Sequence, residues 1–442
     1  MKRWPTKTAR PRAAALAALA LSVALTGCGV SGEKTSAAPS AGGAIEGEIT
    51  LRTLELKPKF TDYVQGVIDA FQQKYPQVKV KWEDVPGDGY NDKLVTDAQA
   101  GTLPDVVNVN TDSFDLLAGR DQLADIGALD PSAKDRYVQG AWDTYRSPGR
   151  SGTYAYPWYV TPEIMSYNSD LAARAGVDLS HTPATVDAYF DIAEQAAKAS
   201  GGAYYAFMAD PGSRLPGDWQ KMGIPLLAAD RKSFVFDTPD AVHWVQRMKD
   251  LYAEGAMPKD SLTDGKNLDQ LFGSGKLLFG PGSPNFLAQV KENSPQTYPK
   301  IKVLPAVTGT LGHIGIYTQA LAVNRTSQHA TAADALASWV TNGPNQVAFS
   351  KIVSIYPSNT DGLADPYFAD PGDGSPVSQS RVVGATALRS ADIDANTPAQ
   401  WNSAVGDAVK ALVQKAMKGE ISPADALAQA QRQANQLLAE KQ

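Results

Sequence analysis

The spacing of apolar residues predicts alternating strands and helices from the second tenth of the chain onward. Residues 48–54 alternate as a strand, residues 60–75 carry apolar side chains at helical spacing, and residues 78–85 alternate again. Residues 90–101 then predict a helix and residues 105–109 a buried strand. This order predicts an α/β fold with a parallel sheet covered by helices on both faces. Ligands of such sheets bind beyond the carboxyl ends of the strands.

The rest of the chain continues this α/β pattern. Residues 154–168 are strand-like and rich in aromatic side chains, and Thr185 is positioned to cap a following helix. The further predicted strands cover residues 276–279, 300–304 and 319–324, and the further predicted helices cover residues 185–198, 240–254, 268–274, 331–342 and 424–440.

Composition narrows the class of protein. The chain has 442 residues, of which 43% are hydrophobic and 20% charged, so it is long enough for two or three globular domains. Its 41 Lys and Arg residues against 47 Asp and Glu residues give a net charge of −6. Because no long basic run follows the first dozen residues, nucleic acid is not expected as a partner.

The amino terminus is organised as an export signal. Five basic residues and no acidic residue precede an apolar stretch, residues 13–26, which is too short to span a bilayer. The stretch ends in Leu25-Thr26-Gly27-Cys28, which contains the only cysteine and resembles the lipobox of bacterial lipoproteins, in which the cysteine is lipidated. The alternative is a chance cysteine in an ordinary signal peptide.

We therefore predict a signal peptide over residues 1–27, lipidation of Cys28, and a flexible tether over residues 28–47 that is rich in Ser, Ala and Gly. The globular body would be held on the extracytoplasmic side of the cell membrane. Removal of the signal peptide takes away five positive charges, which leaves a net charge of −11.

Six further motifs, in this order, resemble the extracellular solute-binding proteins of bacterial ABC sugar importers, the class that includes maltose-binding protein. They are Phe71-Gln-Gln-Lys-Tyr-Pro76; Leu103-Pro-Asp-Val-Val107 with Asn110; Ala155-Tyr-Pro-Trp158 running into Ser166-Tyr-Asn168; Leu271-Phe-Gly-Ser-Gly-Lys276 with Gly280-Pro281; Ile355-Tyr-Pro357; and Gly419-Glu-Ile-Ser-Pro-Ala-Asp-Ala426. The resemblance covers nearly all of residues 48–442.

The resemblance implies a type II-like periplasmic-binding-protein fold, in which two lobes, each a mainly parallel sheet flanked by helices, are joined by a hinge. The chain would cross between the lobes near residues 160–164, 306–310 and 351–356. The N-terminal lobe would comprise residues 48–161 and 311–352, and the C-terminal lobe residues 162–310 and 353–442.

The function that the resemblance implies is binding and not catalysis. A monomer without a cofactor would capture a sugar or oligosaccharide in the cleft between the lobes. It would then deliver this ligand to the permease subunits of an ABC transporter in the membrane.

Aromatic side chains are the first candidates for a sugar site, because aromatic rings pack against the C–H faces of sugars. Trp158 and Tyr159 precede the first crossing, where the family lines its cleft, and Trp401 lies where maltose-binding relatives carry a sugar-stacking aromatic residue. Tyr317 follows the second crossing, and Trp219 begins a predicted helix after a predicted loop at residues 214–218. For each of them the alternative is packing in the hydrophobic core.

Polar candidates lie at predicted strand ends and crossings. Glu55 follows the first strand, Asn110 and Asp112 follow the third, and Glu163 lies on the first crossing. The alternative for these residues is a solvated loop or a helix cap. Further candidates, where the family brings backbone close to its ligand, are Gly282 and Asn285. The segment after Gly280 lacks the tryptophan that the family commonly has there, so we expect no stacking platform from this loop.

Enzymatic and metal-binding motifs are incomplete. The histidines, His181, His243, His313 and His329, lack the spacing of a zinc site. No G-x-S-x-G motif occurs. Two alternatives stay open: a surface glycosidase, which needs a pair of carboxylates, and the same fold with a non-sugar solute. A cluster of Arg or Lys in the cleft would favour an anionic solute, whereas aromatic and acidic candidates favour a neutral polyol.

Overall fold

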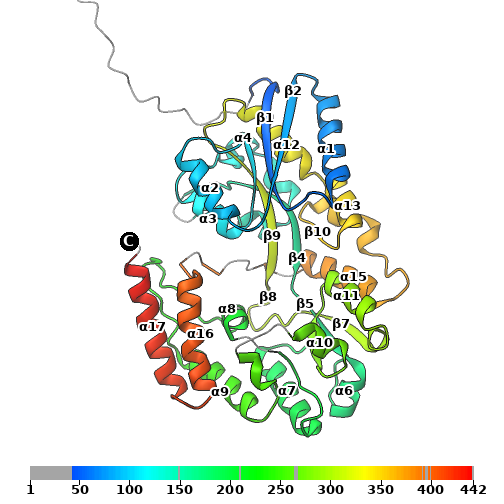
Figure 1. Cartoon of the computed structure of the whole chain (residues 1–442), viewed down its shortest axis with the longest axis vertical. Coiled ribbons are helices and arrows are strands. Elements are labelled where there is room, and N and C mark those ends of the chain that lie inside the picture. The colour runs from blue at the N-terminus through cyan, green and yellow to red at the C-terminus, as the bar shows by residue number, and fades with distance from the viewer. Residues whose placement is uncertain are drawn as a thin grey trace, which may run out of the picture. The chain divides into compact units, whose positions relative to one another are not determined.

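The computed structural model describes residues 42–147, 150–208, 211–262, 267–390, 392–393, 397–398 and 400–440. The predicted signal peptide, Cys28 and most of the predicted tether lie outside the described residues. From β1 onward the helices and strands form two lobes, each built around its own sheet (Figure 1).

The N-terminal lobe contains a six-stranded sheet in the order β10-β4-β9-β3-β1-β2. Its strands, in chain order, are β1 (Gly47–Leu54), β2 (Val78–Val85), β3 (Val106–Val109), β4 (Tyr156–Pro162), β9 (Ile316–Val323) and β10 (Tyr356–Pro357). The strands expected in the first part of the chain are therefore confirmed, with bounds that differ by a residue.

The direction of the strands differs from a mainly parallel sheet. β1 is parallel to β2 and β3, whereas β9 is antiparallel to both β3 and β4, and β10 is antiparallel to β4. The reason is the chain path: β4 leaves this lobe at its carboxyl end, so β9, which returns from the other lobe, runs in the opposite direction.

Helices cover both faces of this sheet, as the alternating elements predict (Figure 1). Leu321 and Val323 of β9 point to one face, where they pack in a core with α1 (Thr61–Lys74), α12 (Ala330–Val340) and α13 (Gly343–Ile352). Ala320 and Ala322 point to the opposite face, toward α2 (Tyr90–Gln99) and α3 (Thr111–Ala118). Short helices follow α3: α4 (Ile126–Leu129), η1 (Ala133–Arg136) and α5 (Gln139–Asp143).

The C-terminal lobe contains a three-stranded antiparallel sheet in the order β6-β5-β7, formed by β5 (Ile164–Asn168), β6 (Phe279–Pro281) and β7 (Ile301–Pro305). The helices that follow β5 along the chain are α6 (Ser169–Ala175), α7 (Val186–Ser200), α8 (Pro211–Lys221), α9 (Pro239–Ala253), η2 (Lys259–Leu262), α10 (Leu268–Gly273), α11 (Pro284–Asn293) and η3 (Tyr298–Lys300). The strand predicted at residues 276–279 lies a few residues later, as β6.

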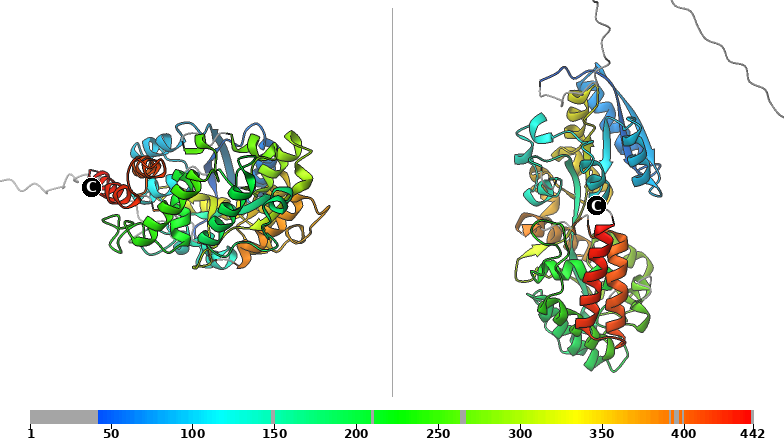
Figure 2. Two further views of the ribbon diagram at one scale, coloured as in Figure 1. Left: turned by 90° about the horizontal axis from the view of Figure 1, so that it is seen from below. Right: turned by 90° about the vertical axis from the view of Figure 1, so that its left-hand side faces the viewer.

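The last two helices, α16 (Ser403–Met417) and α17 (Pro423–Ala439), lie side by side (Figures 1 and 2) and pack on the same core as α7, α8 and α9. The predicted cap at Thr185 is confirmed, because its Oγ1 accepts a hydrogen bond of 3.0 Å from the backbone N–H of Ala188.

The chain crosses between the lobes in three places. Glu163 alone separates β4 from β5, and the second crossing joins β7 to β9 through β8 (His313–Ile314), which pairs with β11 (Asp392–Ile393). The third crossing lies later than predicted, because β10 still belongs to the N-terminal sheet. The chain then passes through α14 (Thr360–Leu363) and η4 (Pro366–Phe368) to α15 (Pro376–Ser390).

A hydrophobic cluster fills the hinge between the lobes. It joins Val160 and Tyr356 of the N-terminal sheet to Ile164 of β5 and to Ala385 and Leu388 of α15. The two lobes are thus connected by packed side chains as well as by the crossing strands. Among the described residues, the structure shows no helix that combines the length and the hydropathy needed to cross a membrane.

Candidate functional site

A cavity of about 300 Å³ lies beside the hinge, in the size range of small-molecule sites. Its walls come from α7, α8, β5, β6 and the first two crossings. The lining residues are Glu163, Ile164, Met165, Val186, Tyr189, Phe207, Met208, Arg214, Asp218, Lys221, Leu268, Phe279, Gly280, Pro281, Ala306 and Val307.

The polar wall of this hinge cavity is one side of α8. Arg214, Asp218 and Lys221 are four and three residues apart, so they project from the same side of the helix. Arg214 Nε donates to Asp218 Oδ2 at 3.1 Å, and the indole N–H of Trp244 donates to the same oxygen at 3.1 Å. The Asp218 carboxylate is therefore fixed by Trp244 in the position where it pairs with Arg214.

The second ion pair joins α8 to the first crossing. Lys221 Nζ lies 2.7 Å from Glu163 Oε2, and the lysine side chain is buried while the glutamate is half exposed. Together with Arg214 and Asp218, these groups place two cations and two anions on the cavity wall. The charges balance, so the wall offers planar polar groups without a net field for an anion.

Aromatic rings lie behind the polar wall. The guanidinium of Arg214 lies over Tyr189, 4.8 Å from the ring centroid, and over Phe207 at 5.1 Å. Burial raises the pKa of Tyr189 to about 12, so its hydroxyl is neutral and can both donate and accept hydrogen bonds.

One face of the β4–β9 pair supplies the N-terminal lobe's part of the hinge. Thr161 lies directly opposite Tyr317 in the register, and Tyr159 lies opposite Gln319. Along β4, Tyr159 and Thr161 alternate with buried residues, and Glu163 continues the alternation on the same face. Of the three predicted site residues on this face, Glu163 lines the hinge cavity, whereas Tyr159 packs against the N-terminal core with its ring centroid 5.8 Å from that of Phe349. A role of Tyr317 in ligand binding stays a prediction.

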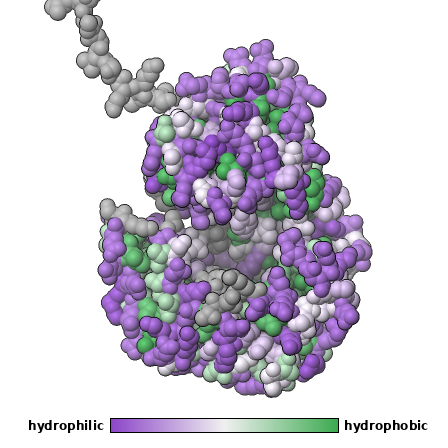
Figure 3. Space-filling view, viewed as in Figure 1, coloured by the Kyte–Doolittle hydropathy of each residue, from purple (hydrophilic) through white to green (hydrophobic). Residues whose placement is uncertain are grey.

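A second and larger hollow, of about 580 Å³, lies between the lobes. The N-terminal lobe contributes Asp115, Thr144 and Arg146 to its lining, and the C-terminal lobe contributes residues that include Gln220 and Arg231. Figure 3 shows the surface hollowed between the two lobes. Burial raises the pKa of Asp115 to about 6, and the charge of Arg231 opposes this shift.

Two predicted aromatic residues lie in hydrophobic cores instead of at a surface. Trp158 is 1% exposed and stacks on Phe349, with 5.6 Å between the ring centroids. Trp219 is fully buried among Phe236, Trp244 and Trp401, although its helix lines the hinge cavity with other residues. For both tryptophans the core packing that was their alternative is what the structure shows.

Trp401 is half-buried, with its ring edge-on to Phe234 and Phe236. Its backbone N–H donates to the carbonyl of Pro398, which lines the interlobe hollow. A role in ligand binding therefore stays a prediction for this residue.

The polar candidates of the N-terminal lobe lie at the carboxyl ends of β1 and β3. Glu55 is exposed, has a positive φ of 52°, and accepts a hydrogen bond from the Gly87 N–H at 2.8 Å. Asn110 is the cap of α3 in place of Asp112: its side chain accepts from the backbone of Ser113, whose hydroxyl accepts in return from the backbone N–H of Asn110. Asp112 is exposed in the first turn of the same helix.

The two candidates after β6 lie differently. Gly282 is buried and its N–H donates to the Ile164 carbonyl, so its backbone closes the strand pairing. A Cβ there would lie 2.7 Å from the backbone of Met165, which explains the glycine by close approach of two chains. Asn285 is exposed in the first turn of α11.

The residues that sequence reasoning missed are Tyr189, Arg214, Asp218 and Lys221. The last three lie on α8, which contains Pro216 and Gly217, and residues 214–218 were predicted to form a loop. The available signal was the spacing of four between Arg214 and Asp218, which is typical of an ion pair along a helix.

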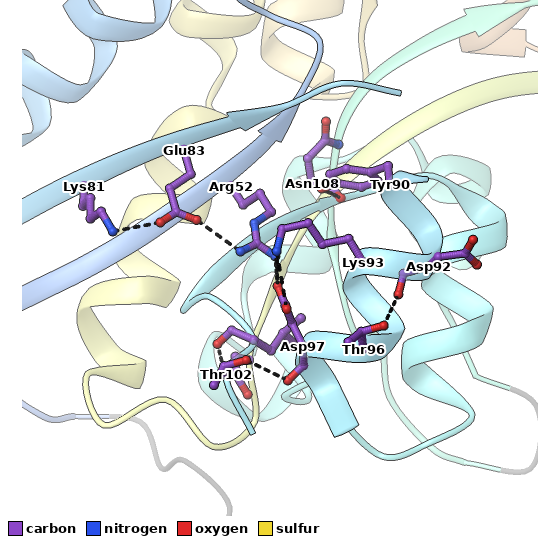
Figure 4. Close-up of polar contacts among 12 residues, drawn as sticks. Arg52, Lys81, Glu83, Tyr90, Asp92, Lys93, Thr96, Asp97, Thr102 and Asn108 are labelled. Carbon is purple, nitrogen blue, oxygen red and sulfur yellow. Dashed lines mark hydrogen bonds and ion pairs between the residues drawn. The ribbon is translucent and has the colours of Figure 1, made fainter. Parts of the chain in front are cut away.

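A further charged cluster in the N-terminal lobe is structural. Arg52 of β1, 5% exposed, lies 2.5 Å from Asp97 of α2 and 3.1 Å from Glu83 of β2 (Figure 4). Lys81 and Lys93 complete the cluster from the exposed side. Every carboxylate of the cluster faces a cation, so it ties two strands to a helix. Over the described part of the chain, no three His, Cys, Asp or Glu residues are grouped as a metal ion would need.

Two lobes of α/β structure around a hinge cavity define the class of two-lobed binding proteins. The profile of the family described as bacterial extracellular solute-binding protein matches residues 57–347, and the chain belongs to this family.

Individual relatives agree with this assignment. A candidate binding protein of Brucella abortus (strain 2308) is 28% identical over 289 residues, which cover 62% of this chain and 68% of the relative. An uncharacterised lipoprotein of Streptomyces antibioticus is 26% identical over 341 residues, 74% of each chain. Among solved structures, a candidate oligosaccharide periplasmic-binding protein from Synechococcus sp. MITs9220 has a TM-score of 0.79 at 29% identity, covering 89% of this chain and 99% of its own.

Proposed function

We propose that this protein captures a neutral sugar or oligosaccharide in the cleft between its lobes. The observation that carries the proposal is the charge-balanced hinge cavity, in which the pairs Arg214–Asp218 and Glu163–Lys221 lie in front of aromatic rings. Planar charged groups pair with adjacent hydroxyls of a sugar, and a balanced wall gives an anion no advantage. The oligosaccharide description of the Synechococcus relative supports the same ligand class.

In this proposal the bound sugar closes the lobes by contacting the N-terminal lobe in addition to Glu163 at the crossing and α8 of the C-terminal lobe. A ligand shifts such an equilibrium only if it binds the closed state more tightly than the open one. The closed form would then deliver the sugar to the permease subunits of an ABC transporter. The protein itself binds without catalysing a reaction.

We also infer that the body is held at the outer face of the cell membrane by a lipid on Cys28. The lipobox-like sequence motivates this proposal, and the Streptomyces relative is described as a lipoprotein. Mass spectrometry of the native protein tests it: a diacylated amino-terminal cysteine is expected, and an unmodified or uncleaved terminus would contradict it.

The ligand is tested by thermal-shift screening of the purified body against mono- and oligosaccharides, followed by calorimetry of the best binder. A bound sugar at 100 times its Kd stabilises the folded state by about 2.7 kcal/mol, so a ligand raises the melting temperature. If a sugar acid binds and no neutral sugar does, the proposal of a neutral ligand is contradicted.

The same screen separates binding from the glycosidase alternative. Chromatography of each oligosaccharide after long incubation is expected to recover it intact, and multiple-turnover release of products would contradict a binding function.

A further inference from the structure

Tyr317 is the most exposed large aromatic side chain of the described residues, at 57% of its surface. It lies on β9, two residues after Gly315, so the two positions share a face of the sheet. A Cβ on Gly315 would lie 3.4 Å from Glu163 Oε2, which places the glutamate on this face as well. Glu163 lines the hinge cavity, so Tyr317 is an exposed side chain on a face of the sheet that ends at this cavity.

A chain of buried amides holds the Tyr317 hydroxyl. Gln319 Nε2 donates to the Tyr317 oxygen at 2.6 Å, and Asn108 Nδ2 donates to Gln319 Oε1 at 2.8 Å. Both amide residues are 2% exposed. Asn108 Nδ2 also donates to the backbone carbonyl of Ala320 at 3.1 Å. The hydroxyl of Tyr90, which lies beside Asn108 in Figure 4, donates to the backbone carbonyl of Asn108.

The backbone carbonyl of Ala320 fixes the direction of each hydrogen bond in the series that links Asn108, Gln319 and Tyr317. The Ala320 carbonyl can only accept, so the part of the Asn108 amide that faces it must be the NH₂ group. The same NH₂ group faces Gln319, which must therefore present its oxygen to Asn108 and its own NH₂ group to Tyr317. A phenol has a single hydrogen, and when its oxygen accepts from Gln319 that hydrogen is left to point outward.

We propose that Asn108 and Gln319 are positioning residues that make Tyr317 a hydrogen-bond donor toward the cleft. An exposed tyrosine without such a partner turns its hydroxyl to donate or accept as its surroundings change. Here the solute must offer an acceptor oxygen at Tyr317, such as a ring, glycosidic or hydroxyl oxygen of a sugar. This consequence for the solute rests on the proposed function, whereas the direction of the bond does not.

The direction is tested first without any solute, by NMR of the side-chain amides in labelled protein. The Gln319 amide, assigned by its loss in Gln319→Leu, is expected to show one hydrogen-bonded proton that shifts upfield and exchanges faster in Tyr317→Phe. An amide signal that is the same in wild type and Tyr317→Phe would overturn the proposal.

The solute arm uses maltose and arabinobiose with their monodeoxy and monodeoxyfluoro derivatives, measured by calorimetry at pH 8. Tyr317→Phe keeps the ring and loses the donor, so binding is expected to weaken about three- to tenfold. Gln319→Glu keeps the hydroxyl but reverses the bond, because a carboxylate only accepts, and it is expected to weaken binding at least as much. In the Tyr317→Phe background the same Gln319→Glu change should add no further loss.

Fluorine can accept a hydrogen bond weakly but cannot donate one. At the sugar position whose oxygen accepts from Tyr317, the fluoro derivative should therefore bind the wild type better than the deoxy derivative. Tyr317→Phe should abolish that difference. Gln346→Leu is the matched control, since Gln346 is another buried glutamine of the same lobe, bonded to the Thr341 carbonyl and to Ser358. It should lower stability and leave affinity unchanged.

Wild-type affinity in Gln319→Glu, or a full additional loss in the Tyr317→Phe background, would contradict the positioning role. If neither disaccharide binds the wild type, these probes count against the proposed function. The amide spectra then decide the direction of the hydrogen bond on their own.

Discussion

At the scale of single residues, Asp218 takes part in two interactions at the polar wall, because it pairs with Arg214 and accepts from Trp244. Asp218→Asn leaves the Arg214 cation in a mostly buried place without its anion. We expect the free energy of unfolding to fall by roughly 3 kcal/mol, measured by urea denaturation.

The matched control is an ion pair of the same lobe at the surface. Asp191 lies 2.8 Å from Arg247 and is well exposed, so Asp191→Asn should cost less than about 1 kcal/mol. Equal losses for Asp191→Asn and Asp218→Asn would show that burial of the Arg214–Asp218 pair is not what matters.

Asp334 makes the free energy of unfolding depend on pH. Burial raises its pKa to about 6, while the Tyr156 hydroxyl, which donates to it at 2.8 Å, acts in the opposite direction. Its folded pKa is thus above the unfolded value of about 4. Below pH 4 the group is protonated in both states, and as the pH rises from 4 to above 6 the folded state loses stability.

Asp334→Asn keeps an acceptor for Tyr156 and cannot ionise. We expect the variant to be more stable than wild type at pH 7.5, by up to roughly 3 kcal/mol, and to lose this advantage at pH 4. Unfolding curves across this range measure it. Part of the wild-type slope should remain, because the pKa of Asp115 is raised in the same way. An advantage that is the same at both pH values would point to a cause other than ionisation.

At the scale of elements, β4 shows where periodicity stops being informative. The register of β4 against β9 shifts between Pro157 and Tyr159, so one extra residue interrupts the alternation. Trp158 and Tyr159, although neighbours, therefore both pack toward the core at Phe349, Trp158 fully buried and Tyr159 partly buried. A bulge depends on the partner strand, so the sequence of β4 alone could not assign these two aromatic residues.

α8 shows a different failure, because residues 214–218 were predicted to form a loop but belong to this helix. Pro216 and Gly217 disfavour a helix interior, yet α8 continues through them to Lys221. Leu215 and Trp219 are buried in the core of the lobe, and this packing outweighs the local preference. The polar wall of the hinge cavity was missed for this reason, whereas Glu163 and Tyr317 could be proposed from their places on the crossings.

α15 can be tested through a helical glycine. A Cβ on Gly384 would lie 2.4 Å from the Tyr356 hydroxyl and 2.8 Å from Ile164 Cδ1, within the hinge cluster. Gly384→Ala should therefore lower the melting temperature, at a cost of about 1 to 3 kcal/mol.

Gly66 of α1 provides the comparison, because no atom lies within 4 Å of a Cβ added there. Gly66→Ala should stabilise the protein by about 0.5 to 1 kcal/mol through helix propensity. If both changes stabilise, the close packing of α15 against the hinge is not a constraint.

At the scale of the whole molecule, the alternation of elements predicted an α/β fold, and the family resemblance implied two lobes and the order in which the chain enters them. The predicted mainly parallel sheets and the predicted position of the third crossing were wrong. β10 has two residues, too few to show a period, and its place in the N-terminal sheet depends on pairing with Tyr159 and Val160. These are contacts between distant segments, which local patterns do not contain.

Closure of the lobes should depend on charges that face each other across the interlobe hollow. Asp115 lies on its N-terminal side and Arg231 on its C-terminal side. Asp115→Arg would place two cations opposite each other, the new arginine and Arg231. We expect this change to weaken sugar binding about two- to tenfold. Arg231→Asp in the same chain should restore part of the affinity.

Calorimetry measures the affinities in this charge swap, and small-angle scattering with saturating sugar measures closure. Additive losses in the double variant would show that the two residues do not meet in the closed state.

Glu163 is the one residue between β4 and β5, and it is also a wall of the hinge cavity. In the proposed function, the backbone that bends when the lobes close is thus the backbone that carries a sugar-binding side chain. Sugar binding and lobe movement can then be coupled without a chain of intermediate contacts, because the side chain that binds the sugar and the backbone that bends belong to the same residue. Substitutions at Glu163 should change affinity and the open–closed equilibrium by linked amounts, so neither property can evolve there without the other.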